Sequence, residues 1–504
     1  MSSSSRSTVS KYLIQQGLLL SSSAQTSIQQ RDIYLEGNQI VAIGNHLEVS
    51  PDVTIVDASG LLLCPGLVNG HFHSHEHFHK GRYDNLPLEL WMHFVRPPRQ
   101  AISLTPEQVY LRTMIGAIEA LRTGTTFVVD DVNHAPQFSP ACIDAVFRAY
   151  GEIGLRARVS VSLFDRPFYR SVPFVDEVMP ASIRELLEQQ ACPDRQQMLT
   201  LCQALAETYP PSDRVGFIVA PSAPQRCSDV FLVQLKEFAD QHNLPIMMHL
   251  LETRLQAVTG GILYQDSMVN HLAKLKVLSP QLALQHCVWL TEDDIAQLAD
   301  AGVSVVYNPL SNLKLGSGRM AVRRFLEAGV NVALASDGCG SRDSLNLLSV
   351  MQAAALLNKP PTEPPETWLS AQEAFRLGTE GGAAAFGYQG QLGRLEVGYQ
   401  ADIVGYRLSS PAFVPLNNPL NQLVYAETGA AVDWVMIDGK VVMQQGQLTQ
   451  IKEHQIIAAI EATHQQLLPS LSASEESVNA LLPYYRQIYD RCLKEPIDPA
   501  ITAS

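Results

Sequence analysis

Residues 61–73 read LLLCPGLVNGHFH, a continuous apolar run that ends in two histidines separated by one residue. A strand that is buried on both faces has such a continuous run rather than an alternating pattern. Residues i and i+2 of an extended strand face the same side, so His71 and His73 can point at one ion. The stretch therefore predicts a buried parallel strand that carries two metal ligands at its carboxyl end.

Seven further apolar segments follow this one, and most are separated by segments with helical signals. Thr105 and Thr291 each begin a capping pattern that predicts a helix start. Eight strands that alternate with helices predict a (β/α)₈ TIM barrel of the α/β class, the architecture that needs the fewest assumptions. The other predicted strands are residues 125–131, 156–163, 214–222, 244–250, 282–288, 303–308 and 332–337.

The two ends of the chain carry short strand signals of another kind. Residues 32–35 and 39–43 flank a compact turn, and residues 433–437 and 440–443 flank Asp438-Gly439, a pair typical of type I′ hairpins. Both ends are therefore expected to build one small β-sandwich domain. The predicted parts are a disordered tail (1–10), the β-sandwich (11–64 and 391–450), the barrel (65–390) and a C-terminal helical appendage (451–504) broken by Pro469 and Pro483.

Catalytic groups of a TIM barrel lie where its strands end at their carboxyl side. His71 and His73 end the first predicted strand, His249 ends the fifth, His286 lies near the end of the sixth, and Asp337 ends the eighth. Three neutral imidazoles and a carboxylate suit Zn²⁺ or another divalent ion and leave a position open for water. One such residue would be more often structural, but several at strand ends predict a metal-dependent hydrolase.

Two residues near these ligands are candidates for acting on the attacking water. Glu252 follows His249 by three residues, so it can take a proton from the attacking water and pass it to the substrate. His286 is the candidate for orienting the water or the developing oxyanion.

The motifs resemble those of the amidohydrolase superfamily, in the branch of the S-adenosylhomocysteine/methylthioadenosine deaminases and triazine hydrolases. The resemblance runs from about residue 61 to 439, with several motifs in the same order and spacing. The motifs are PGLVNGHFH (65–73), HLLET (249–253), NPLSNLKLGSG (308–318), SDG (336–338) and LEVGYQAD (395–402).

The resemblance implies that His71, His73, His249 and Asp337 bind metal and that Glu252 is the proton shuttle. It also implies that His286 and Asp337 hold and polarise the water. The family's two-metal branch has a lysine at the end of the fourth strand, whereas residues 219–222 here read VAPS. One divalent ion, Zn²⁺ with Fe²⁺ or Mn²⁺ as alternatives, is therefore expected.

Departures from the resemblance bear on the substrate. Relatives that act on adenosine-type substrates often have Pro-His after the fourth strand, where this chain has Pro221-Ser222. They also have a ribose-reading glutamate, and counting from Trp91 puts Gln100 or its neighbourhood there. Both differences favour a free base, a pterin or a triazine-like ring over a nucleoside. Ser341, Trp91, Gln100 and Arg82 are the candidate substrate contacts.

The predicted reaction is hydrolytic deamination of an aminated purine, pyrimidine, pterin or triazine, with release of ammonia. Alternatives on the same scaffold are removal of chloride or an alkylamine and hydrolysis of a cyclic amide. A non-catalytic metal-binding barrel is a rival from another class, which the retention of all six site residues disfavours. The run from His75 through His77 to His79 and the separate His134 are left without a role; the run is expected to line a loop near the pocket mouth or to face solvent.

Composition and charge bear on the partners and the location of the protein. The 504 residues carry a net charge of −14 at pH 7, which argues against nucleic acid as a partner. No apolar run approaches the ~18 residues that span a bilayer, and the N-terminus lacks the apolar core of a secretory signal. We expect a cytoplasmic protein that acts on a small heterocyclic molecule and does not contact a membrane. The chain could assemble as a homo-oligomer.

Overall fold

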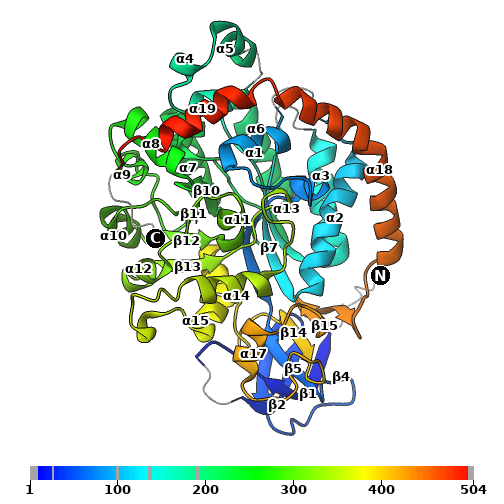
Figure 1. Cartoon of the computed structure of the whole chain (residues 1–504). Helices are drawn as coiled ribbons and strands as arrows, with labels where there is room; N and C mark the ends of the chain where they lie inside the picture. Colours follow the sequence, from blue (N-terminus) through cyan, green and yellow to red (C-terminus); the bar gives the residue numbers. More distant parts are fainter. Residues whose placement is uncertain (1–9, 25–27, 98–101, 134–138, 189–191, 498–504) are drawn as a thin grey trace.

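The computed structural model describes residues 10–24, 28–97, 102–133, 139–188 and 192–497. Figure 1 shows a central barrel surrounded by helices, a small sheet domain below it, and two C-terminal helices that run along its side and across its top. The predicted barrel with a separate sheet domain is confirmed. No helix among the described residues is long and apolar enough to cross a membrane.

The described residues place eight parallel strands in the barrel. They form two four-stranded sheets, in chain order, and every pair within them is parallel. A parallel bridge between Val219 and Ile246 joins the sheets on one side, and the Asp337 N–H donates to the His71 carbonyl on the other (3.1 Å). The strands are β6 (Leu67–Phe72), β7 (Thr125–Val132), β8 (Arg156–Val161), β9 (Val215–Phe217), β10 (Ile246–Leu250), β11 (Leu282–His286), β12 (Ser304–Tyr307) and β13 (Asn331–Leu334).

The first predicted strand is wrong in one respect, because residues 61–73 form two strands. β5 (Leu61–Pro65) pairs with the small sheet, and β6 begins the barrel after Gly66. A Cβ on Gly66 would lie 2.0 Å from the Thr126 hydroxyl, so the chain passes too close to β7 there for a side chain. We propose the boundary between the sheet domain and the barrel at this glycine.

Helices cover the outside of the barrel, and both predicted capping patterns are present. Thr105 begins α2 and Thr291 begins α10, each with a reciprocal capping box. The helices around the barrel include α2 (Pro106–Arg122), α3 (Pro140–Ile153), α6 (Arg195–Thr208), α7 (Asp229–His242), α8 (Arg254–Tyr264), α9 (Met268–Lys274), α10 (Glu292–Asp300), α12 (Val322–Glu327), α14 (Leu347–Leu357) and α15 (Ala371–Arg376).

The small domain is a nine-stranded sheet built from both ends of the chain. β5 and β14 pair antiparallel and so join the N-terminal strands to the C-terminal ones. Asp438 and Gly439 both have positive φ angles, 53° and 73°, in the predicted hairpin turn. The strands besides β5 are β1 (Lys11–Leu19), β2 (Gln29–Glu36), β3 (Gln39–Gly44), β4 (Thr54–Asp57), β14 (Ile403–Arg407), β15 (Val432–Ile437), β16 (Lys440–Gln444) and β17 (Gln447–Leu448).

The C-terminal segment forms two helices, α18 (Glu453–Val478) and α19 (Leu482–Cys492). Pro469 lies inside α18, so the predicted break at this residue is wrong; the helix continues although Pro469 has no N–H to donate. Pro483 lies in the first turn of α19, where a missing N–H costs nothing. Ion pairs of Arg82 with Glu475 (2.8 Å) and of Arg122 with Glu453 attach α18 to the barrel.

Candidate metal centre and catalytic cavity

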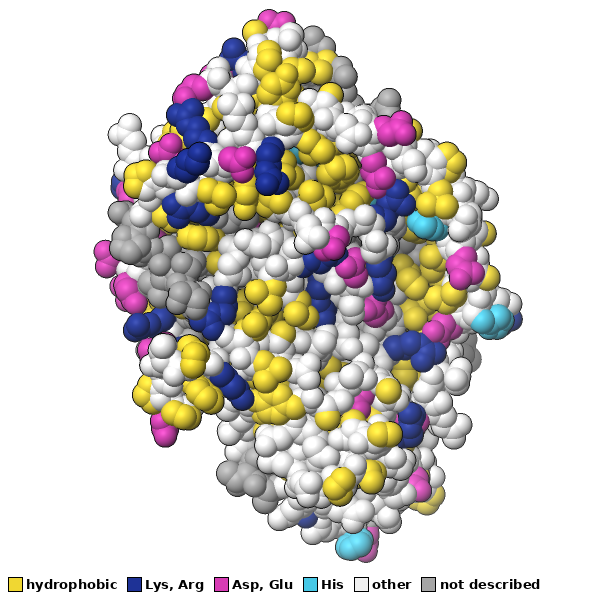
Figure 2. All heavy atoms as spheres, in the orientation of Figure 1, with side chains coloured by type: hydrophobic (Ala, Val, Ile, Leu, Met, Phe, Trp, Pro, Cys, Tyr) yellow, Lys and Arg dark blue, Asp and Glu magenta, His cyan; other side chains and the backbone are white. Residues whose placement is uncertain are grey.

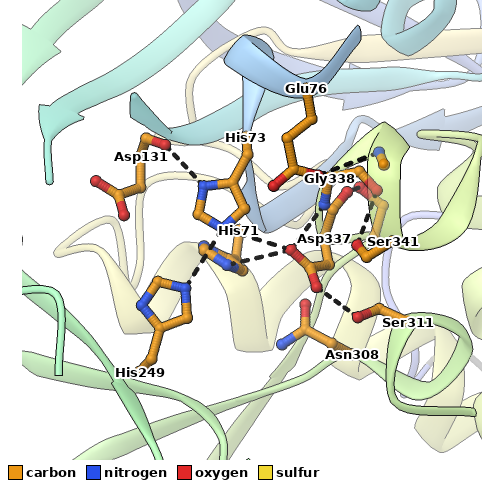
Figure 3. Close-up of polar contacts among 12 residues, drawn as sticks. His71, His73, Glu76, Asp131, His249, Asn308, Ser311, Asp337, Gly338 and Ser341 are labelled. Atoms are coloured by element: carbon orange, nitrogen blue, oxygen red, sulfur yellow. Dashed lines mark hydrogen bonds and ion pairs between the residues drawn. The ribbon is translucent and has the colours of Figure 1, made fainter. Parts of the chain in front are cut away.

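The four predicted ligands meet at the carboxyl ends of their strands. His71 is the last residue but one of β6, and His73 directly follows that strand. His249 lies in β10, and Asp337 lies three residues after the end of β13. His71 Nε2 and His73 Nε2 lie 3.6 Å and 3.5 Å from Asp337 Oδ1. His249 Nε2 lies 3.4 Å from His73 Nε2. Figure 3 shows the three rings and the carboxylate directed at one point.

His71 shows that this point suits a metal ion. Its side chain is fully buried, and neither ring nitrogen has a hydrogen-bond partner among the residues that the structure describes. Burial, together with the neighbouring His73 and His249, lowers the pKa of His71 well below its usual value. The imidazole is therefore neutral, which is the form that binds a metal. A divalent cation would bind a buried nitrogen that is otherwise costly to desolvate. The residues at this point therefore suit a metal ion.

Backbone carbonyl groups fix the other two imidazoles. His73 Nδ1 lies 2.7 Å from the Asp131 carbonyl, and His249 Nδ1 lies 2.8 Å from the Ser222 carbonyl. A carbonyl only accepts, so each Nδ1 carries the proton and each Nε2 keeps its lone pair for the ion. The carboxylate of Asp131 is engaged elsewhere, because it accepts hydrogen bonds from the hydroxyls of Ser160 and Ser162.

Asp337 is held as a carboxylate. The Ser311 hydroxyl donates to its Oδ2, and the Gly338 N–H donates to its Oδ1 (2.7 Å). Burial alone would raise its pKa, but His73, His286 and these hydrogen bonds hold the pKa of Asp337 below its usual value. An anionic oxygen therefore faces the three neutral imidazoles.

Glu252 and His286 form a second group beside the ligands. Glu252 Oε2 lies 3.7 Å from His286 Nε2, and the Ser317 hydroxyl lies 3.4 Å from Glu252 Oε1. His286 Nδ1 lies 3.0 Å from Asn312 Oδ1, which fixes the ring. Burial raises the pKa of Glu252 to about 7, with Asp337 adding to the effect and His286 opposing it. A carboxylate with such a pKa can both take and give a proton near neutral pH.

One cavity of about 700 Å³ is lined by five of these residues: His73, His249, Glu252, His286 and Asp337. Among the candidate substrate contacts, Trp91 lines it and donates from its indole N–H to the Gly340 carbonyl (3.1 Å). Ser341 donates to the Gly338 carbonyl (3.0 Å) and is not among the lining residues, and Arg82 is engaged with Glu475. Gln100 lies outside the described residues.

Two buried glutamates of the cavity wall were missed in the sequence. Glu76 Oε2 accepts a hydrogen bond from the Gly340 N–H (3.1 Å), and burial raises the pKa of Glu76 well above its usual value. Glu89 lies in α1 (Leu88–Val95); its Oε1 accepts from the Thr253 hydroxyl, and its Oε2 is buried with no hydrogen-bond partner in the described ranges. The signal that could have found Glu89 is a single carboxylate within the otherwise apolar helix LELWMHFV.

The histidines after His73 lie in a short helix, η1 (Ser74–His79), in place of the expected loop, and His75 and His79 border the cavity. His75 accepts from the Asn133 N–H (3.2 Å) and lines the cavity. His77 is buried with its Nδ1 2.8 Å from the Ser74 carbonyl. His79 also lines the cavity, and its Nδ1 lies 2.9 Å from the Tyr83 hydroxyl. His134 lies outside the described residues.

Known proteins resemble this chain over most of its length. A sequence model described as the amidohydrolase family matches residues 62–442. The chain is 32% identical over 440 residues to 5′-deoxyadenosine deaminase of Methanothermobacter thermautotrophicus, covering 87% of this chain and 95% of that protein. It is 34% identical over 417 residues to 5-methylthioadenosine/S-adenosylhomocysteine deaminase of Thermococcus sibiricus, covering 82% and 90%.

Solved structures share the fold. The structure of an adenosine deaminase from Xanthomonas campestris with bound zinc superposes with a TM-score of 0.80 at 28% identity, covering 91% of this chain and 99% of that one. Atrazine chlorohydrolase from Arthrobacter aurescens, complexed with zinc, superposes with a TM-score of 0.81 at 24% identity, covering 90% and 100%. At 24% identity, the likeness to atrazine chlorohydrolase shows a shared fold and no shared activity.

Proposed function

Because this chain belongs to the amidohydrolase family and is a hydrolytic deaminase of an aminated nitrogen heterocycle, we propose that its ring is an adenine-type purine and that a single Zn²⁺ serves the reaction. The observation that carries the hydrolytic chemistry is the position of Glu252, 3.7 Å from His286 and grouped with Asp337, which the proposed ligands His71 and His73 also approach. The two relatives above, both named as deaminases of adenine nucleosides, support an adenine-type ring, against the free base, pterin or triazine-like ring that Pro221-Ser222 and Gln100 favoured over a nucleoside.

The proposed ligands of the ion are His71, His73, His249 and Asp337. When bound, a divalent metal lowers the pKa of water at the site towards about 7 and so supplies a nucleophile at neutral pH. The three imidazoles bring no charge, so the carboxylate of Asp337 offsets part of the charge of the ion and keeps it in place.

Glu252 carries the proton in the proposed reaction. Its carboxylate takes a proton from the attacking water and delivers it to a ring nitrogen, which makes the neighbouring carbon electrophilic. The water oxygen bonds to that carbon. Glu252 then carries the proton of the new hydroxyl to the amino group, so the C–N bond breaks, ammonia leaves and a ring carbonyl remains. Because the Asn312 amide oxygen only accepts, the Nδ1–H of His286 donates to it, and the Nε2 lone pair of His286 accepts a hydrogen bond from the attacking water and so orients it.

Ammonia release by zinc-loaded protein tests the proposal. The panel contains adenine, adenosine, 5′-deoxyadenosine, guanine, a pterin and an aminated triazine, with a chlorotriazine measured for chloride. We expect the largest kcat/KM on an adenine compound. Turnover confined to the pterin or the triazine would overturn the adenine assignment, and chloride release alone would show that the leaving group differs.

The pH profile follows from Glu252. Because burial raises the pKa of this carboxyl to about 7, the ionised form that takes the proton is lost as the pH falls through 7. We expect log(kcat/KM) to fall with a slope of one below this pH, on a substrate that does not titrate in the range. A profile flat down to pH 5 would contradict the role of Glu252 as the base.

A further inference from the structure

The C-terminal helices supply part of the wall of the catalytic cavity. The family model ends at residue 442, before α18 begins at Glu453. Leu471 of α18 and Tyr485 of α19 nevertheless line the cavity that contains Glu252, and both side chains are buried. Figure 1 shows α19 crossing the top of the barrel next to α1 and α8. The shape of the cavity therefore depends on a segment beyond the residues that match the family.

Polar contacts hold α19 in place over the cavity. Arg254 is the first residue of α8, and its guanidinium donates to the backbone carbonyls of Cys492 (3.2 Å) and Glu495 (2.6 Å). Arg491 of α19 forms an ion pair with Glu177. Because α8 directly follows the loop that carries the proposed proton shuttle, these contacts tie the position of α19 to the catalytic end of the barrel.

Aromatic rings gather where α19 meets the cavity. Tyr485 lies against His93 of α1, with ring centroids 3.9 Å apart. Phe168 lies 5.2 Å from His93 and 6.1 Å from Tyr485, and the Arg226 guanidinium lies over the rings of Phe168 and Phe164. Burial lowers the pKa of His93 to about 3, so this ring is uncharged at neutral pH. These four rings (His93, Phe164, Phe168 and Tyr485) all line the cavity, and we refer to them as the aromatic wall.

The surroundings of the aromatic wall are apolar. Val172 and Leu187 also line the cavity and belong with Tyr485 to one buried hydrophobic cluster. Figure 2 shows hydrophobic side chains gathered over the upper part of the molecule, where α19 runs, with Lys and Arg among them. The metal corner, by contrast, is lined by the carboxyl groups of Glu252 and Asp337. The cavity therefore joins a polar corner that suits the chemistry to an aromatic end that suits the binding of an apolar group.

We propose that the aromatic wall is a specificity site, at which Tyr485 of α19 selects a heterocycle that carries an aromatic substituent. The inference rests on the proposed function for the ring that is deaminated, and it adds the chemistry of the rest of the substrate. With the heterocycle at the metal corner, a flat substituent that extends towards α19 lies against His93, Phe168 and Tyr485. Such a contact removes apolar surface from water and adds the favourable geometry of offset or edge-to-face rings.

Adenine nucleosides that differ at the 5′ position test the aromatic wall. 5′-Phenylthio-5′-deoxyadenosine carries an aromatic ring, its cyclohexylthio counterpart carries a ring without aromatic faces, and 5′-deoxyadenosine carries neither. For wild type, kcat/KM on the phenylthio compound should be about 10-fold above that on 5′-deoxyadenosine and about threefold above that on the cyclohexylthio compound. Tyr485→Leu should lose most of this advantage, mainly through KM, with a far smaller change on 5′-deoxyadenosine. Tyr485→Phe should keep the advantage.

Tyr489→Leu is the matched control, because it makes the same change on a half-buried tyrosine of α19 that is not among the residues lining the cavity; it should equal wild type. Phe168→Leu tests the aromatic wall from another segment if Tyr485→Leu is not folded. Equal kcat/KM on the phenylthio and cyclohexylthio compounds, or an advantage that survives both Tyr485→Leu and Phe168→Leu, would overturn the proposal.

Calorimetric binding of the same three compounds to Glu252→Gln, with and without Tyr485→Leu, separates this result from the proposed function. If none of the compounds is turned over, the proposed function fails, but a preference for the phenylthio compound that is lost with Tyr485 still supports the aromatic wall. Turnover without any such preference, in kcat/KM or in binding, would support the proposed function and overturn the aromatic wall.

Discussion

The Glu252→Gln variant should turn over its substrate about a thousandfold more slowly than wild type, within the range of general acid–base catalysis. Glutamine keeps the shape of the side chain but can neither take nor deliver the proton. Since ionising this buried carboxyl is unfavourable, as its raised pKa shows, the neutral amide should leave the melting temperature unchanged or higher. Single-turnover kinetics and thermal unfolding check the two parts of this expectation.

Glu237→Gln is a suitable control, because it makes the same chemical change on the exposed face of α7. The variant Glu252→Gln should also bind metal at the wild-type ratio. A kcat within tenfold of wild type would rule out Glu252 as the proton shuttle. A loss of activity together with a loss of metal would point to a structural effect.

The second large effect concerns His71. We expect His71→Asn to lower metal affinity by at least about 100-fold, more than the ~10–100-fold typical of losing a partner behind a ligand. The reason is that neither nitrogen of His71 has a hydrogen-bond partner within the described part of the chain, so binding an ion is the main interaction that the change removes. Activity should fall with metal content.

Metal per chain after dialysis, measured by mass spectrometry, gives a reading independent of activity. Added Zn²⁺ should raise the melting temperature of wild type, because a ligand that binds the native state stabilises it, and should leave His71→Asn unchanged. His454→Asn on the exposed side of α18 is the control. Full metal content in His71→Asn would show that the ion is held elsewhere.

The sequence was sufficient for the parts of the site that follow from strand periodicity. His71 and His73 are two apart in an apolar run, and His249 and Asp337 occur at or just past strand ends, so the barrel fixes where they meet. The exact residue at which a strand begins or ends was harder to predict from the sequence. Gly66 splits the first segment because β7 passes close to it, and that approach is a tertiary fact without a local signature.

Residues of the cavity wall were harder to predict for the same reason. Glu89, Arg96 and Arg226 come from loops and short helices whose directions depend on packing. Arg226 lies over the ring of Phe164, a contact between residues far apart in the sequence that no local pattern predicts. The carbonyl that orients His73 was also inaccessible, since backbone groups carry no sequence signal.

The pairing of β5 with β14 has a consequence for how the chain is made. Residues 61–65 leave the ribosome long before residues 403–407, and at ordinary rates of synthesis the interval is on the order of half a minute. Throughout that time β5 has an unpaired edge, the kind of surface to which other chains add strands. The barrel must therefore close as an insert between two halves of a sheet. A nascent chain that stalls before residue 403 should be far more prone to aggregate than one released a few dozen residues later.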